Sequence, residues 1–162
     1  MPDRVDFILQ QWARERPDLD VSPIAVIGRI SRLSRRFEQE IGRHLGEFGL
    51  TPDEYDVLAT LRRSGKPYAL NPRALLGSMM VSSATVTHRL DKLEARGLVE
   101  RLPDPSDRRG VVARLTPSGR RLVDRASQRH YEDEDRLLAT LSRQDRATLA
   151  DLLRRLAEAN DC

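Results

Sequence analysis

Cysteine is almost absent from this chain, and its scarcity sets the first limits on function. The single cysteine, Cys162, is the last of 162 residues. One terminal thiol cannot form a disulfide framework or a cysteine-based metal site, and no second cysteine is present to resolve an oxidised one. The sequence therefore argues against a disulfide scaffold and against a thiol redox sensor.

Long apolar runs and catalytic motifs are missing too. No segment approaches the roughly 20 apolar residues of a membrane span, and the first residues, MPDRVDF, contain no apolar signal core. The histidines have no ligand-type neighbours, and there is no glycine-rich phosphate loop or nucleophile–base spacing. We expect a cytoplasmic protein that is not an enzyme, contacts no membrane and uses no metal or cofactor.

Lysine is scarce, whereas arginine is abundant. Lys66 and Lys92 are the only lysines among 28 basic residues, and the formal net charge is just +3. Affinity for nucleic acid would therefore have to come from local clusters of arginine, whose planar group suits bidentate contacts. Hydrophobic residues at 39% and charged residues at 33% fit a helix-rich protein.

The stretch SSATVTHRLDKLEARGLVERLPDPSDRRGVVARLT carries the strongest functional signal. Ser82 or Ser83 can cap a helix that ends at Gly97, which we call the reading helix. Helical spacing predicts its buried face: Val86, Leu90 and Leu93. The opposite face is small and polar in its first turns, as close approach to base edges requires. Arg89 lies roughly 60° from Val86, so we expect it to point into the protein.

A basic β-hairpin follows this helix. We expect a strand over 98–102, a turn over 103–107 and a return strand over 111–115, with Thr116 and Pro117 starting the next helix. Arg108 and Arg109 are expected at the hairpin tip, where they can reach phosphates or a narrow minor groove, and Asp107 can orient one of them.

A groove-sized helix followed by a basic hairpin predicts a winged-helix DNA-binding domain. The candidate DNA-binding residues are Ser82, Ser83, Ala84, Thr85, Thr87, His88, Asp107, Arg108 and Arg109. The alternative is a winged-helix protein-interaction module without direct ligand sensing. The salt dependence of DNA binding distinguishes these two functions. A steep loss of affinity with salt indicates DNA binding, because phosphate contacts release counterions, whereas a flat response favours the protein-interaction module.

Amphipathic helices flank this unit on both sides. The sequence predicts a mainly α fold with a small β-hairpin wing, in three parts: N-terminal helices over 1–50, a winged helix-turn-helix over 51–116 and C-terminal helices over 117–162. The apolar faces of the terminal helices are larger than one small domain can bury. We therefore expect a homodimer, which also presents two reading helices to successive major grooves.

Three segments resemble the MarR family of winged-helix transcriptional regulators: TPDEYDVLATL from Thr51, the reading helix, and DRRG with the LTPSG that follows it. The resemblance spans nearly the whole chain. It implies a homodimer joined through its helical ends, a pseudo-palindromic double-stranded DNA operator, repression as the usual sign of regulation, and release when a small ligand binds.

A narrower resemblance involves the extra N-terminal helix and the ERPDLDVSP that follows it, which are similar to the urate-responsive branch of PecS-, HucR- and TamR-like regulators. Matching motif to motif, the ligand-binding residues of that branch fall on Trp12, Asp56, Arg89 and Arg101. His88 departs from the asparagine of those relatives, which affects base preference rather than ligand binding.

The chemistry of these four side chains suits a small planar anion. Trp12 offers a face for stacking, the two arginines offer paired N–H donors, and Asp56 can accept from a ligand N–H. Urate, another purine, and a tricarboxylate such as trans-aconitate or citrate all remain open as the effector.

Overall fold

The computed structural model describes residues 1–79, 86–105 and 107–160, with the backbone alone at 107–109. The chain forms two compact units, Met1–Arg43 and His44–Cys162, and the boundary between them falls within helix α2 (Ile24–Gly46). The three-part division expected from the sequence follows function rather than compactness, and stays a prediction. No helix in the described ranges is long and apolar enough to span a membrane.

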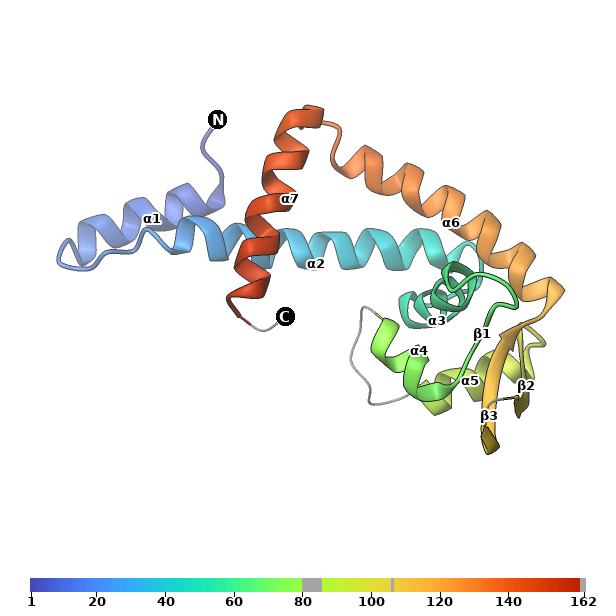
Figure 1. The fold of residues 1–162 in the computed structure, drawn as a ribbon. Coiled ribbons are helices and arrows are strands. Elements are labelled where there is room, and N and C mark those ends of the chain that lie inside the picture. Colours follow the sequence, from blue (N-terminus) through green and yellow to red (C-terminus); the bar gives the residue numbers. More distant parts are fainter. Residues whose placement is uncertain (80–85, 106, 161–162) are drawn as a thin grey trace. The chain divides into compact units, whose positions relative to one another are not determined.

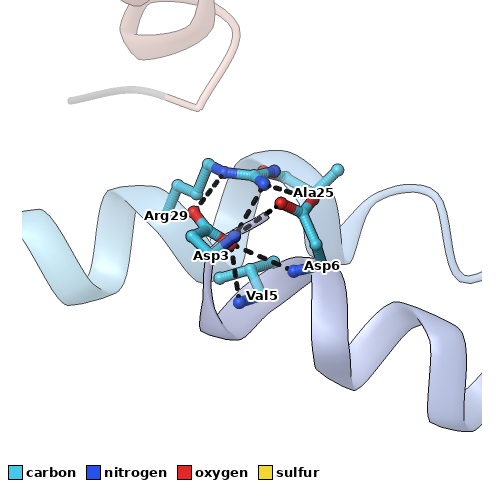
Figure 2. Close-up of polar contacts among 5 residues, drawn as sticks. All are labelled: Asp3, Val5, Asp6, Ala25 and Arg29. Carbon is cyan, nitrogen blue, oxygen red and sulfur yellow. Dashed lines mark hydrogen bonds and ion pairs between the residues drawn. The ribbon is translucent and has the colours of Figure 1, made fainter. Parts of the chain in front are cut away.

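The first unit contains α1 (Arg4–Glu15) and most of α2. Asp3 caps α1 in a capping box with Asp6, which satisfies free N–H groups of the first turn. Arg29 of α2 reaches back to this cap, and Figure 2 shows its guanidinium between Asp3, Asp6 and the carbonyl of Ala25. The start of α1 is therefore fastened to α2 by one cation.

Below this polar cluster, Val5 is 2% exposed and packs on Gly28, where an added Cβ would lie 3.4 Å from a Val5 methyl carbon. Much of the remaining apolar surface of the unit is exposed: Phe7, Trp12, Leu19, Val26, Ile27 and Leu33. Three of these exposed residues, Val26, Ile27 and Leu33, lie on α2.

The second unit contains the remaining helices: α3 (Pro52–Arg63), α4 (Pro72–Ser78), α5 (Val86–Ala95), α6 (Pro117–Leu137) and α7 (Arg143–Glu158). Side-chain caps begin four of them, at Thr51, Asn71, Thr116 and Ser142. The start at Thr116 confirms the sequence prediction for the helix that follows the hairpin. The expected cap of the reading helix at Ser82 or Ser83 lies outside the described residues.

A three-stranded antiparallel sheet accompanies these helices, in the order β1 (Ala69–Leu70), β3 (Asp107–Leu115), β2 (Val99–Asp104). Figure 1 shows α3, α4 and α5 gathered beside this sheet. The sequence predicts the hairpin of β2 and β3, and it misses β1.

The expected turn over 103–107 is wrong in its extent. Pro103 pairs with Val111, and Asp104 pairs with Asp107 across a register shift. Strand β2 lies at the sheet edge, where proline is tolerated because its missing N–H faces away from the partner strand. Arg108 and Arg109 therefore belong to β3, beside the tip and not in the turn itself.

The end of the hairpin is joined closely to α6. A Cβ built on Gly119 would lie 1.9 Å from the carbonyl oxygen of Leu98, so only glycine fits there. The Thr116 hydroxyl donates to the carbonyls of Gly97 and Leu98 at 2.7 and 3.2 Å. These contacts explain why threonine and glycine stand three residues apart in the LTPSG segment.

Candidate functional site

The reading helix α5 has the two faces that its sequence predicts. Val86, Leu90 and Leu93 are buried, whereas Thr87 and His88 are exposed. Ser82, Ser83, Ala84 and Thr85 lie outside the described residues, as do the side chains of Asp107, Arg108 and Arg109. The described part of α5 thus leaves a small polar face open for a partner.

Arg89 turns inward from α5, as expected from the helical wheel. Its side chain is 13% exposed, and Nη2 donates to Oδ2 of Asp53 in the first turn of α3 at 2.8 Å. Its other terminal nitrogen, Nη1, is buried and has no hydrogen-bond partner among the described residues. Because a buried guanidinium N–H without a partner is costly, Nη1 of Arg89 is well placed to donate to an additional acceptor.

Arg101, on β2, reaches the flank of α5. Its guanidinium donates to Asp91 at 2.6 Å and to Glu94 at 2.5 Å, and its backbone N–H donates to Glu94 at 3.2 Å. The hydrogen bond with Asp91 raises the pKa of Arg101 further above its ordinary value. The wing strand and α5 are thus joined by two carboxylates around one cation.

The four predicted ligand-binding residues are distributed over four elements. Arg89 and Arg101 engage different carboxylates, on α3 and on α5 respectively. Asp56 is half-buried on α3, where helical periodicity alone predicts a solvated side chain. Trp12 belongs to the first unit and is 42% exposed on α1. Their assembly into one site stays a prediction.

Arg96, near the C-terminal end of α5, is a contact that the sequence reasoning missed. Its Nη2 donates to the carbonyl oxygen of Gly49 at 2.9 Å, and its Nη1 donates to Oε2 of Glu54 at 3.3 Å. The available signal was the spacing of Arg89 and Arg96, which lie two helical turns apart and hence on one side of α5.

A buried histidine pair was also missed. His44 Nε2 and His130 Nδ1 lie 2.9 Å apart, beside the ring of Tyr55, although 86 positions separate them in sequence. Burial lowers the pKa of His130, against the opposing effect of Glu134. No local pattern could reveal this pair, because helix packing alone brings it together. Among the described residues, no cluster of His, Asp and Glu side chains is arranged to hold a metal ion.

Comparison with known proteins agrees with this architecture. The model of the MarR family matches residues 50–111. The HTH-type transcriptional regulator PecS of Dickeya dadantii is 41% identical over 152 residues, which cover 94% of this chain and 92% of that protein. The multiple antibiotic resistance protein MarR of Salmonella typhimurium is 30% identical over 82% of this chain and 92% of its own length.

Solved structures give the same result. A mutant of MarR from Escherichia coli, complexed with operator DNA, has a TM-score of 0.72 at 27% identity and covers 85% of this chain and 99% of its own. BpsR of Bordetella bronchiseptica has a TM-score of 0.73 at 27% identity, over 82% of this chain and 92% of its own. With the winged-helix fold and the relatives' shared role, these matches identify a DNA-binding regulator rather than an enzyme: the chain belongs to the MarR family of transcriptional regulators.

Proposed function

We propose that the protein acts as a homodimeric repressor on a pseudo-palindromic operator and leaves the DNA when a small anionic effector binds. The observation that carries this proposal is the state of Arg89. It lies on the reading helix, is almost buried, and keeps one guanidinium nitrogen without a hydrogen-bond partner among the described residues. An effector oxygen at that nitrogen would act directly on the DNA-reading element.

The DNA contacts are assigned to the exposed side of α5 and to the wing. Thr87 and His88 face outward on α5, and Arg108 and Arg109 follow the wing tip in β3. Base-edge contacts from α5 set sequence preference, whereas wing arginines contact phosphates and add salt dependence. The MarR–operator complex supports the general arrangement.

Dimer formation is supported by the apolar side of the last helix. In the part of the chain that the structure describes, α7 buries none of its residues, and four of its leucines are between 40% and 53% exposed: Leu149, Leu152, Leu153 and Leu156. A contiguous apolar face of this kind marks an interface in a soluble protein. A second copy of the chain can bury these leucines against its own terminal helices.

Effector action follows from the partners of the two arginines. An anion at Arg89 competes with Asp53 and loosens the contact between α5 and α3. An anion at Arg101 competes with Asp91 and Glu94, both of which lie on α5. In either case the anion shifts the equilibrium between two positions of the reading helix. The size of this shift is set by how much more tightly the anion binds one position than the other.

The class of effector is a small anion with a flat ring or several carboxylates. DNA binding by BpsR is regulated by 6-hydroxynicotinic acid, a ring that carries one carboxyl group. Urate and other purines fit stacking on Trp12, and tricarboxylates such as trans-aconitate or citrate fit the two arginines.

The decisive test compares the wild type with Arg89→Ala in a gel-shift titration of effector against bound DNA. We expect the variant to bind DNA, more weakly because the contact between α5 and Asp53 is lost, and to release it only at much higher effector concentrations. Arg62→Ala, which removes an ion pair with Asp124 away from α5 and α7, serves as the control. Equal release from wild type and Arg89→Ala would refute the proposed role of Arg89. A thermal-shift panel of urate, hypoxanthine, trans-aconitate and citrate then identifies the class, because a ligand at 1,000 times its Kd adds about 4 kcal/mol.

A further inference from the structure

The C-terminal end of the reading helix is tied to the turn between α2 and α3 by one side chain, Arg96. Its two terminal nitrogens take two different acceptors, the carbonyl oxygen of Gly49 and the carboxylate of Glu54. Because a guanidinium is planar and its donors have fixed directions, such a two-point contact sets orientation as well as distance.

Both acceptors are themselves held in place. Oε2 of Glu54 also accepts the backbone N–H of Thr51 at 3.0 Å, in the capping box that begins α3, and Glu54 is only 9% exposed. Gly49 has a left-handed backbone, with φ of 67°, between the end of α2 and the start of α3. The anchor for Arg96 is therefore a backbone carbonyl of this turn together with a carboxylate that also caps α3.

A second contact fixes the same side of α5 seven residues earlier. Arg89 reaches Asp53, the neighbour of Glu54 in the first turn of α3. Residues seven apart lie two turns along one face of a helix, about 10 Å from each other. Two points at that separation define the direction of the helix axis relative to α3. Arg89 is assigned to the effector, whereas Arg96 has no such assignment.

We propose that Arg96 is a positioning residue for operator recognition, which holds α5 at the angle that a major groove requires and itself contacts no DNA. The proposal rests on the assignment of α5 as the DNA-reading element. Its consequence is specific: loss of the Arg96 contact weakens binding to the operator and leaves binding to unrelated DNA unchanged, because the latter depends on phosphate charge rather than on helix direction.

The test measures fluorescence anisotropy with two duplexes of equal length, one selected from random DNA by the wild-type protein and one scrambled. Arg96→Ala and Glu54→Gln are compared with the wild type. The glutamine keeps an oxygen for the N–H of Thr51, so the cap of α3 survives while the charge opposite Arg96 is lost. We expect the Kd for the selected duplex to rise about tenfold in each variant, the size typical of residues that couple elements without touching the ligand.

The double variant Arg96→Ala/Glu54→Gln should be no weaker than Arg96→Ala alone, because both substitutions break the same contact. Arg62→Ala is the matched control. It removes an arginine of the same exposure, 39% against 38% for Arg96, which pairs with Asp124 and not with α5. We expect Arg62→Ala to leave both Kd values unchanged.

Three results would overturn the proposal. If Arg96→Ala weakens both duplexes and lowers the slope of log K against log salt by about 0.9, Arg96 contacts a phosphate. If Arg96→Ala binds the selected duplex with the wild-type Kd, after correction for the folded fraction, while its thermal stability falls, Arg96 only stabilises the fold. If Glu54→Gln binds the selected duplex like the wild type, the Glu54 contact does not position α5.

Substitution of Thr87 and His88 tests separately whether α5 reads the operator. If these substitutions leave the sequence preference of the protein unchanged, α5 does not read the operator.

Discussion

Substitution of Gly119 by alanine tests how closely the wing is joined to α6. An added Cβ would lie 1.9 Å from the oxygen, 2.9 Å from the carbonyl carbon and 3.2 Å from the Cα of Leu98. All three are backbone atoms of the turn before β2, so no side-chain rotation relieves the overlap. The first turn of α6 must move away from Leu98 by about 1 Å, because real Cβ contacts rarely fall below 3.0 Å.

Such a displacement disturbs the hydrogen bonds that the carbonyl of Leu98 accepts from the backbone N–H and the hydroxyl of Thr116, at 3.1 and 3.2 Å. Forcing a methyl group into a packed site costs about 1–3 kcal/mol, and each lost hydrogen bond adds about 1 kcal/mol. We therefore expect the free energy of unfolding to fall by about 3–5 kcal/mol. For a chain of this length the Tm should fall by about 6–20 °C.

Urea denaturation and differential scanning calorimetry at one fixed protein concentration measure this change. Gly42→Ala is the control, because Gly42 lies inside α2 and an added Cβ there meets nothing within 4 Å. We expect that control to stabilise the protein by about 1 kcal/mol, the difference in helix propensity between the two residues. A Gly119→Ala variant within about 0.5 kcal/mol of the wild type, the range of ordinary surface substitutions, would show that the reasoning is wrong.

Two further predictions concern His130 in the second unit and Arg29 in the first. Burial lowers the pKa of His130 in the folded protein, whereas the unfolded chain takes up this proton near pH 6.5. Stability from this group is thus fully present above about pH 6.5 and is lost as the pH falls from there toward the folded pKa. The urea midpoint should therefore be lower at pH 5.5 than at pH 8, and a flat or rising midpoint would contradict the assignment. In the first unit, Arg29→Ala should loosen α1 and speed chymotrypsin cleavage at its exposed aromatic residues Phe7 and Trp12. Arg16→Ala, which removes only an exposed pair with Asp18, should leave the cleavage rate unchanged, and equal rates in the two variants would count against the Arg29 contact.

The helices could be predicted from the sequence because their starts are local. The hydroxyl of Thr51 and the carboxylate of Glu54 cap α3 within one turn, and Thr116 with Pro117 begins α6 in the same manner. Each signal needs only residues three or four apart, so it survives without knowledge of the rest of the fold.

The strands were predicted less well because pairing is not local. Strand β1 is only Ala69–Leu70, and it exists because these residues pair with Arg114 and Ala113 of β3, more than 40 positions later. Pro103 suggested a turn, yet a place at the sheet edge allows it to continue β2. In both cases the deciding partner is a distant strand.

The outward face of α5 and the inward direction of Arg89 follow from the order of the amino acids alone, since periodicity fixes which way a helical side chain points. The partner of the Arg89 side chain depends on how the helices pack. Arg89 pairs with Asp53 and not with the neighbouring candidate Asp56, and Arg96 pairs with Glu54. A sequence pattern cannot distinguish between carboxylates at adjacent positions of one helix. The packing of α5 on α3 does, because it brings Asp53 to Arg89 and Glu54 to Arg96.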